Sequence, residues 1–244
     1  METDGFAVFD HDARPARWAA VARAHAMALS RDTDVQAQNL RHGNTWFVGV
    51  DILPNDHAGA VDGVPLGGPW HSYVPELPQH KAQVSIIYPG YPARDPDQSA
   101  ANHRFRVDRM AAHVDGLLPE VPDRRRHPRE FHAYILGIPL NDSPAAPTVV
   151  WQGSHHIMQS ALADAIGDRD PREVDVTEAY HAARREVFDR CDVVPVQVGV
   201  GGAFLIQRFA LHGTAPWSGP PGEGRMIAFF RPEYADPMDW LGSA

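Results

Sequence analysis

Residues 201–234 read GGAFLIQRFALHGTAPWSGPPGEGRMIAFFRPEY, and they carry the strongest indication of the fold class. Its two runs of branched and aromatic residues, GGAFLIQRFALHG and GRMIAFFRPEY, predict two closing strands. The Pro- and Gly-rich segment between them predicts a loop. In the second run, alternation places four side chains on one face of the strand: Arg225, Ile227, Phe229 and Arg231. The chain is therefore expected to end in β-structure with one largely apolar face.

Further strands are predicted upstream of this stretch. They are TWFVGVDIL (45–53), QVSIIYPG (83–90), HAYILGIPL (132–140) and TVVWQGSHH (148–156), the last ending in a turn at Gly153. The segment 103–118 is also expected to begin as a strand. Helices are predicted at 15–30, which is rich in alanine, and within 164–192. Residues 54–78 are dense in Gly, Pro, Asp and His, which predicts a long loop, and long loops in compact domains often serve as lids.

Six or more short strands with flanking helices, without internal repeats or a linker, predict one mainly β double-sheet barrel. We expect a single domain over residues 1–244. Residues 1–102 would supply an N-terminal helix, strands and the lid loop, and residues 103–234 would supply the barrel motifs. A length of 244 residues is compatible with one domain, because all-β barrels often reach this size undivided.

The composition excludes several classes of partner. The formal net charge of −9, from 22 basic and 31 acidic residues, argues against a nucleic-acid or membrane-surface partner. The single cysteine, Cys191, excludes an internal disulfide and fits a reducing compartment. Residues 1–12 lack the pattern of a secretory signal, and no apolar run approaches the ~20 residues that cross a bilayer. We expect a cytoplasmic protein with a small-molecule partner; the sequence does not predict its oligomeric state.

A metal site is suggested by His113-Val114-Asp115 together with the distant His212. On a strand, residues i and i+2 share a face, so His113 and Asp115 would aim an imidazole and a carboxylate at one point. With His212 they form a 2-His-1-carboxylate set, which holds Fe(II) and leaves positions open for oxygen chemistry. For His212 alone, the competing interpretation is a buried, hydrogen-bonded histidine. Gly213 and Thr214 favour the metal site, since they would let backbone and hydroxyl approach a ligand closely.

Arg225 is the candidate for binding an acidic cosubstrate, because an arginine on an inward strand face needs a carboxylate partner. A buried structural salt bridge is the alternative. Arg231 would lie about 20 Å further along the strand, too far to serve the same small diacid, and is expected at the rim or surface.

These motifs, in this order, resemble the phytanoyl-CoA dioxygenase-like group: His113-Val114-Asp115, the TVVWQGSHH turn, GGAFLIQRFALHG and GRMIAFF. The resemblance covers about residues 107–234. It implies a double-stranded β-helix (a jelly-roll or cupin-like barrel) and the cofactors Fe(II), 2-oxoglutarate and O2. It further implies that His113, Asp115 and His212 bind iron, while Arg225 and Thr214 bind the distal carboxylate of 2-oxoglutarate. The retained Asp115 favours hydroxylation over halogenation, and Ser154 and His155 would bond to backbone in a structural turn.

The substrate is left open by the sequence. We expect a small molecule, such as an amino acid derivative or natural-product intermediate, hydroxylated with release of succinate and CO2. Arg208 is either a salt-bridge residue or a ligand for a substrate carboxylate, and Trp46 either core or pocket wall. An acyl-CoA would need a basic entrance, which only the arginine-rich loop 124–129 offers. The alternatives are a metal-dependent barrel enzyme without 2-oxoglutarate and a non-catalytic β-barrel binding module.

Overall fold

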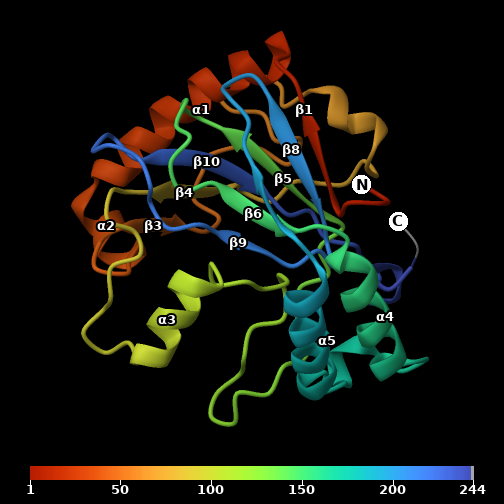
Figure 1. Cartoon of the computed structure of the whole chain (residues 1–244). Coiled ribbons are helices and arrows are strands. Elements are labelled where there is room, and N and C mark those ends of the chain that lie inside the picture. Colours follow the sequence, from red (N-terminus) through yellow and green to blue (C-terminus); the bar gives the residue numbers. More distant parts are fainter. Residues whose placement is uncertain (243–244) are drawn as a thin grey trace.

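Two facing sheets form the centre of the molecule in a computed structural model, which describes residues 1–242 (Figure 1). The larger sheet has seven strands in the order β1-β8-β5-β10-β4-β3-β2, and the smaller has three in the order β7-β6-β9. Every strand pairing in both sheets is antiparallel. This arrangement is the predicted double-stranded β-helix with flanking helices.

The strands are β1 (Phe6–Phe9), β2 (Leu40–Arg41), β3 (Trp46–Gly49), β4 (Gln83–Ile87), β5 (Tyr134–Pro139), β6 (Thr148–Trp151), β7 (Val193–Val196), β8 (Ala203–Gln207), β9 (His212–Thr214) and β10 (Arg225–Phe230). The helices are α1 (Ala13–Arg31), α2 (Thr33–Asn39), α3 (Ala100–Asp108), α4 (Ser154–Ile166) and α5 (Thr177–Arg190). Short 3-10 turns lie at Pro69–Ser72, Pro171–Glu173 and Pro237–Trp240. None of the helices within residues 1–242 is long and apolar enough to span a membrane.

The alternation of side chains along β10 divides the core. Ile227 and Phe229 point into the space between the two sheets, where they pack with residues of β5, β6, β7 and β8. Met226, Ala228 and Phe230 point the other way, into the core beneath α1. A third cluster lies between the small sheet and helices α4 and α5, which flank it in Figure 1. The predicted inward face of β10 is therefore confirmed, and it faces the interior of the barrel.

Most predicted elements are confirmed, but three segments differ. The segment 103–118 does not begin as a strand: helix α3 ends at Asp108 and begins after Ser99, whose side chain accepts a hydrogen bond from the Asn102 amide at 3.1 Å. The run 201–213 is not one strand either. It turns after β8 and continues as β9 in the other sheet, with Arg208 in the turn. The segment after Gly153 begins helix α4 at once, ten residues before the predicted helical region.

The long loop 54–78 lies in the core beneath α1 rather than over the space between the sheets, where a lid was expected. Val61 and Trp70 are fully buried in the same cluster as Trp18 of α1. The Trp18 indole also donates a hydrogen bond to the Gly59 carbonyl at 2.8 Å. The loop is irregular because of its composition, but its apolar residues attach it to the outer face of the large sheet.

Candidate metal centre

His113 and His212 lie side by side on two segments that are almost a hundred residues apart in the chain. Their backbones exchange two hydrogen bonds, His113 N to His212 O at 2.9 Å and His212 N to His113 O at 3.0 Å. The two imidazole rings lie 4.6 Å apart between centroids. His113 occupies an isolated bridge and Asp115 follows in a turn, so the pair shares a side without the regular strand that the sequence predicted.

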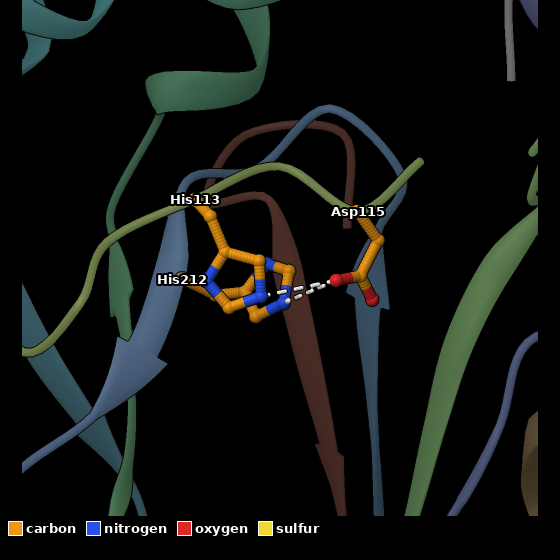
Figure 2. A group of neighbouring side chains, drawn as sticks. All are labelled: His113, Asp115 and His212. Carbon is orange, nitrogen blue, oxygen red and sulfur yellow. Dashed lines mark ion pairs between the residues drawn. The ribbon is translucent and has the colours of Figure 1, made fainter. Parts of the chain in front are cut away.

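Asp115 completes the predicted triad, and Figure 2 shows its carboxylate facing both rings. Its Oδ1 atom lies 3.0 Å from His113 Nε2 and 3.7 Å from His212 Nε2. One nitrogen or oxygen from each of the three side chains lies within 4.8 Å of the others. Two imidazole nitrogens and one carboxylate oxygen are a donor set suited to a divalent transition metal such as Fe(II).

Both histidines are held in the orientation that a metal requires. His113 Nδ1 donates to the Ala111 carbonyl at 2.9 Å, and His212 Nδ1 donates to the Ala210 carbonyl at 3.0 Å. Since a proton on Nδ1 leaves the Nε2 lone pair free in a neutral imidazole, both Nε2 atoms are available as ligands.

The charge states of the buried members also suit a metal. Burial lowers the pKa of His212 to about 4, so its ring is neutral at pH 7. For Asp115, burial acts to raise the pKa, but the positive charge of Arg231 outweighs it with the help of the histidines, and the pKa lies well below its usual range. A neutral imidazole and an ionised carboxylate are the forms that bind metal.

Arg231 lies inside the site, although the sequence predicted a rim or surface position. Its Nε donates to Asp115 Oδ2 at 2.6 Å, and its Nη1 donates to Gln83 Oε1 at 2.6 Å. One oxygen of the Asp115 carboxylate is therefore engaged by the guanidinium, and the other faces the two histidines. The sequence did indicate this position. Side chains alternate along a strand, so Arg231, six residues after Arg225, is expected on the same inward face.

A cavity of about 330 Å³ opens from the triad, within the usual range for small-molecule sites. Trp46 lies in its wall, one of the two positions that the sequence allowed for it, and its indole nitrogen donates to Ser85 Oγ at 3.0 Å. Thr214 also lines this cavity, opposite Thr148 in the β6–β9 pairing.

Arg225 is buried, with 4% of its surface exposed, and all three guanidinium nitrogens lack a hydrogen-bond partner among residues 1–242. Burial lowers its pKa to about 10, so it remains cationic at pH 7. Thr148 Oγ1 is likewise buried without a partner in the described chain. Thr148 lines both the metal cavity and a small adjoining pocket that Arg225 lines. The sequence analysis did not single out Thr148 as a site residue. Its position at the start of a predicted buried strand could have indicated a polar side chain that faces the interior.

Arg208 is not directed toward the triad. Its guanidinium donates to the carbonyls of Trp240 at 2.8 Å and Gly242 at 2.5 Å, near the C-terminal end of the described chain. Arg208 thus takes neither of the two roles expected for it, because the chain turns between β8 and β9 and its guanidinium bonds to backbone carbonyls. It holds the C-terminal segment in place, and it does not line the metal cavity.

Two structural roles that the resemblance implied are confirmed. Ser154 Oγ accepts a hydrogen bond from the Leu211 amide at 2.9 Å, which fixes the chain just before His212. His155 Nε2 bonds to the Glu2 carbonyl at 3.0 Å. Gly213 permits a close approach, as expected, but to backbone rather than to a ligand: a Cβ there would lie 2.2 Å from the Met110 carbonyl oxygen.

No protein-family model and no curated protein matches the chain. Among solved structures, the non-heme alpha ketoglutarate dependent carbocyclase SnoK from nogalamycin biosynthesis is 13% identical, covering 99% of this chain and 88% of SnoK, with a TM-score of 0.52. EctD from S. alaskensis with 2-oxoglutarate and 5-hydroxyectoine is 18% identical over 93% of this chain and 71% of EctD (TM-score 0.48). HygX from Streptomyces hygroscopicus with nickel and 2-oxoglutarate is 14% identical over 96% and 85% (TM-score 0.43). The match to SnoK shows that the chain has the fold of the non-heme 2-oxoglutarate-dependent oxygenases. The phytanoyl-CoA dioxygenase-like group is not singled out within it.

Proposed function

We propose that this chain is an Fe(II)- and 2-oxoglutarate-dependent oxygenase that hydroxylates a small molecule. The observation that carries the proposal is the orphaned guanidinium of Arg225, which is buried on the same inward strand face as the residues of the metal cavity. A permanent cation in an apolar core is costly unless an anion joins it. A dicarboxylate that reaches from the triad to Arg225 provides that anion.

Each residue of the site has a separate role in binding the metal or the cosubstrate under this proposal. His113, Asp115 and His212 would hold Fe(II) through two Nε2 atoms and one carboxylate oxygen. Arg225 would bind the distal carboxylate of 2-oxoglutarate in a bidentate pair, for which the planar guanidinium is suited. Thr148 and Thr214, paired across the small sheet, offer hydroxyl donors along the way.

When bound, Fe(II) and 2-oxoglutarate supply the activation of O2, and one oxygen atom enters the substrate while 2-oxoglutarate becomes succinate and CO2. The overall change converts a C–H group to C–OH, with 2-oxoglutarate supplying the two electrons that O2 needs beyond those of the substrate. The chain keeps this chemistry away from water with the apolar side chains of Ile135, Ile227 and Phe229. Arg231 holds one oxygen of Asp115, so that the carboxylate presents the other to the metal.

The proposal is tested by anaerobic titration of the metal-free protein with Fe(II) and 2-oxoglutarate. We expect the weak visible charge-transfer band between iron and a chelating keto acid in the wild type. Asp115→Ala should abolish the band by removing a metal ligand, and Arg225→Met should require far more 2-oxoglutarate to produce it. Iron binding without the band would overturn the 2-oxoglutarate assignment and favour a metal-dependent barrel enzyme of other chemistry. A protein that binds no metal would instead support a non-catalytic binding module.

A further inference from the structure

Three carboxylates besides Asp115 line the metal cavity, and they come from three separate segments. Asp51 follows β3, Glu130 precedes β5, and Glu233 follows β10. We call Asp51, Glu130 and Glu233 the mouth carboxylates. The side chains of Asp51 and Glu130 are 60% and 53% exposed, and Glu233 is also exposed, so all three meet the solvent where a ligand would enter. Bonding to His132 lowers the pKa of Glu130, which keeps it ionised at pH 7.

Little positive charge faces these groups. Arg231 is paired with Asp115, and no lysine lines the cavity within the described residues. His80 Nε2 accepts the Arg231 backbone N–H at 2.8 Å, and its Nδ1 lies 2.7 Å from Asp51 Oδ1 and 2.6 Å from the Lys81 carbonyl. His132 lies between the Glu130 carboxylate at 3.0 Å and the Arg231 carbonyl at 3.2 Å. Even with both His80 and His132 counted as cations, three carboxylates face two imidazolium groups.

The basic loop 124–129 does not place positive charge near the mouth carboxylates. Arg125 pairs with Asp175 and Glu178. Arg126 donates to the Leu117 carbonyl, and Arg129 pairs with Glu120. None of the residues from Arg124 to Arg129 lines the metal cavity. An acyl-CoA or another phosphorylated substrate would therefore meet a negative mouth with no basic group to receive its phosphates.

A second observation points to a ligand at this mouth. Val50 and Leu118 are apolar and lie 55% and 71% exposed, and both line the same cavity beside Trp46. Large apolar side chains that rim a pocket typically mark a binding surface. Together with the buried, unpartnered Thr148 hydroxyl deeper in the cavity, they show a site with apolar walls and an acidic rim.

We infer that the substrate is an amphiphilic cation, a small molecule that carries an amine or guanidine group. This inference rests on the proposed oxygenase function and specifies its substrate class. The cationic group would lie among the mouth carboxylates, and the apolar part would pass Trp46, Val50 and Leu118 toward the metal. Fe(II), Arg225 and Arg231 carry four positive charges against three negative charges on 2-oxoglutarate and Asp115. The three mouth carboxylates reverse that balance, so they decide the sign of the field that the substrate meets.

The test uses three probes with one skeleton: 4-(trifluoromethyl)benzylamine, 4-(trifluoromethyl)benzyl alcohol and 4-(trifluoromethyl)benzoate. Their binding to the protein loaded with Zn(II) and 2-oxoglutarate is measured by fluorine NMR titration at pH 7. An exposed ion pair changes affinity by roughly two- to fivefold, so three mouth carboxylates should make the amine bind about tenfold more tightly than the alcohol. The benzoate should bind most weakly. The preference should fall as salt is added, because the rim is exposed to solvent.

The variants are Asp51→Asn, Glu130→Gln and Glu233→Gln, singly and combined, which keep shape and hydrogen-bond acceptors while removing charge. Asp51 has a φ of 54°, and asparagine tolerates that left-handed conformation well. Asp62→Asn is a matched control. Asp62 has a φ of 50°, is 64% exposed and pairs with His25 at 2.7 Å, as Asp51 pairs with His80, but it does not line the metal cavity. The combined variant should lose the preference for the amine, and Asp62→Asn should retain it.

Two results would overturn the inference: equal or reversed affinities for the amine and the benzoate, or a preference that survives the combined variant. The charge-transfer band, measured on the same preparations, keeps the two claims apart. If the charge-transfer band forms but the amine is not preferred, the inferred substrate class is wrong and the oxygenase assignment stands. Amine selectivity in a protein that shows no band supports the cation-binding cavity and removes the oxygenase assignment.

Discussion

Replacing Arg225 with methionine should stabilise the metal-free protein while destroying its response to 2-oxoglutarate. Burial lowers the pKa of Arg225 from its usual range to about 10, which corresponds to a cost of about 3 kcal/mol for keeping the guanidinium charged. Because a lowered pKa in a cation means that the charged form is disfavoured in the folded state, this cost is present at every pH below about 10. Exchanging a buried ion for an apolar side chain of similar length is neutral or stabilising by about 1–4 kcal/mol. We expect the unfolding free energy of Arg225→Met to rise by about 1–3 kcal/mol.

The effect on cosubstrate binding should have the opposite sign. Removing one partner of a buried charge pair typically costs about 2–5 kcal/mol, or at least roughly 30-fold in affinity. The assay is thermal unfolding and calorimetric titration with Zn(II) as a redox-inert metal. For a chain of 244 residues, 1 kcal/mol shifts the melting temperature by about 2–4 °C. Wild type at a hundredfold excess of 2-oxoglutarate over Kd should gain about 2.7 kcal/mol, a gain that Arg225→Met should lack.

Arg208→Met is the matched control, because Arg208 is just as buried but donates to two backbone carbonyls. Its replacement leaves those carbonyls without donors and should lower stability by about 1–3 kcal/mol, with little change in 2-oxoglutarate affinity. The reasoning fails if Arg225→Met is destabilised like Arg208→Met and still binds 2-oxoglutarate within threefold of wild type. Arg225 would then be a structural residue.

Three further perturbations test the site and the fold. Arg231→Gln should weaken Zn(II) binding about 10–100-fold in a competition titration, because it frees the second oxygen of the triad carboxylate, while leaving the 2-oxoglutarate Kd at saturating Zn(II) within threefold. Gly213→Ala should lower stability by about 1–3 kcal/mol and weaken Zn(II) binding, since its Cβ would collide with the Met110 carbonyl; unchanged melting would contradict the close approach. Hydrogen bonds from Thr177 lower the pKa of Asp175 to about 2, so this carboxylate stabilises the fold above about pH 4 and loses that effect as the pH falls toward 2. Asp175→Asn should therefore cost up to about 1 kcal/mol at pH 7, and the deficit should vanish near pH 2 in acid-unfolding curves.

The sequence predicts the barrel and the triad because both depend on short-range patterns. Alternation along β10 correctly separates Ile227 and Phe229 from the residues beneath α1. The spacing of His113 and Asp115 places both on one side, although a single bridge to His212 replaces the expected strand. The segments that differ depend on contacts that the local pattern does not contain. The turn between β8 and β9 is fixed by the Leu211 amide bonding to Ser154 Oγ, a residue 57 positions away.

The loop 54–78 also shows that local sequence does not predict where a segment lies in the folded protein. Its composition predicts irregular backbone, which is confirmed, and irregular loops of this length often cover a site. Its position is decided instead by a few apolar side chains, Val61 and Trp70 among them, that find a partner in α1. Composition thus predicts how such a segment folds locally, whereas the pairing of its buried residues decides which face of the molecule it covers.

Arg225 at the start of β10 and Arg231 just after its end show why function requires both the sequence pattern and the structure. The pattern assigns Arg225 and Arg231 to one face, and their separation of about 20 Å shows that they cannot share one small ligand. Only the tertiary structure shows that Arg231 is matched by a carboxylate from the chain itself, whereas Arg225 has none among the described residues. The chain pairs the cation that follows β10 with its own carboxylate, and it buries the cation at the start of β10 without a partner among the described residues. The second cation therefore lies where an external anion would complete the site. This asymmetry argues for an anion at Arg225, and 2-oxoglutarate is the anion that we propose there.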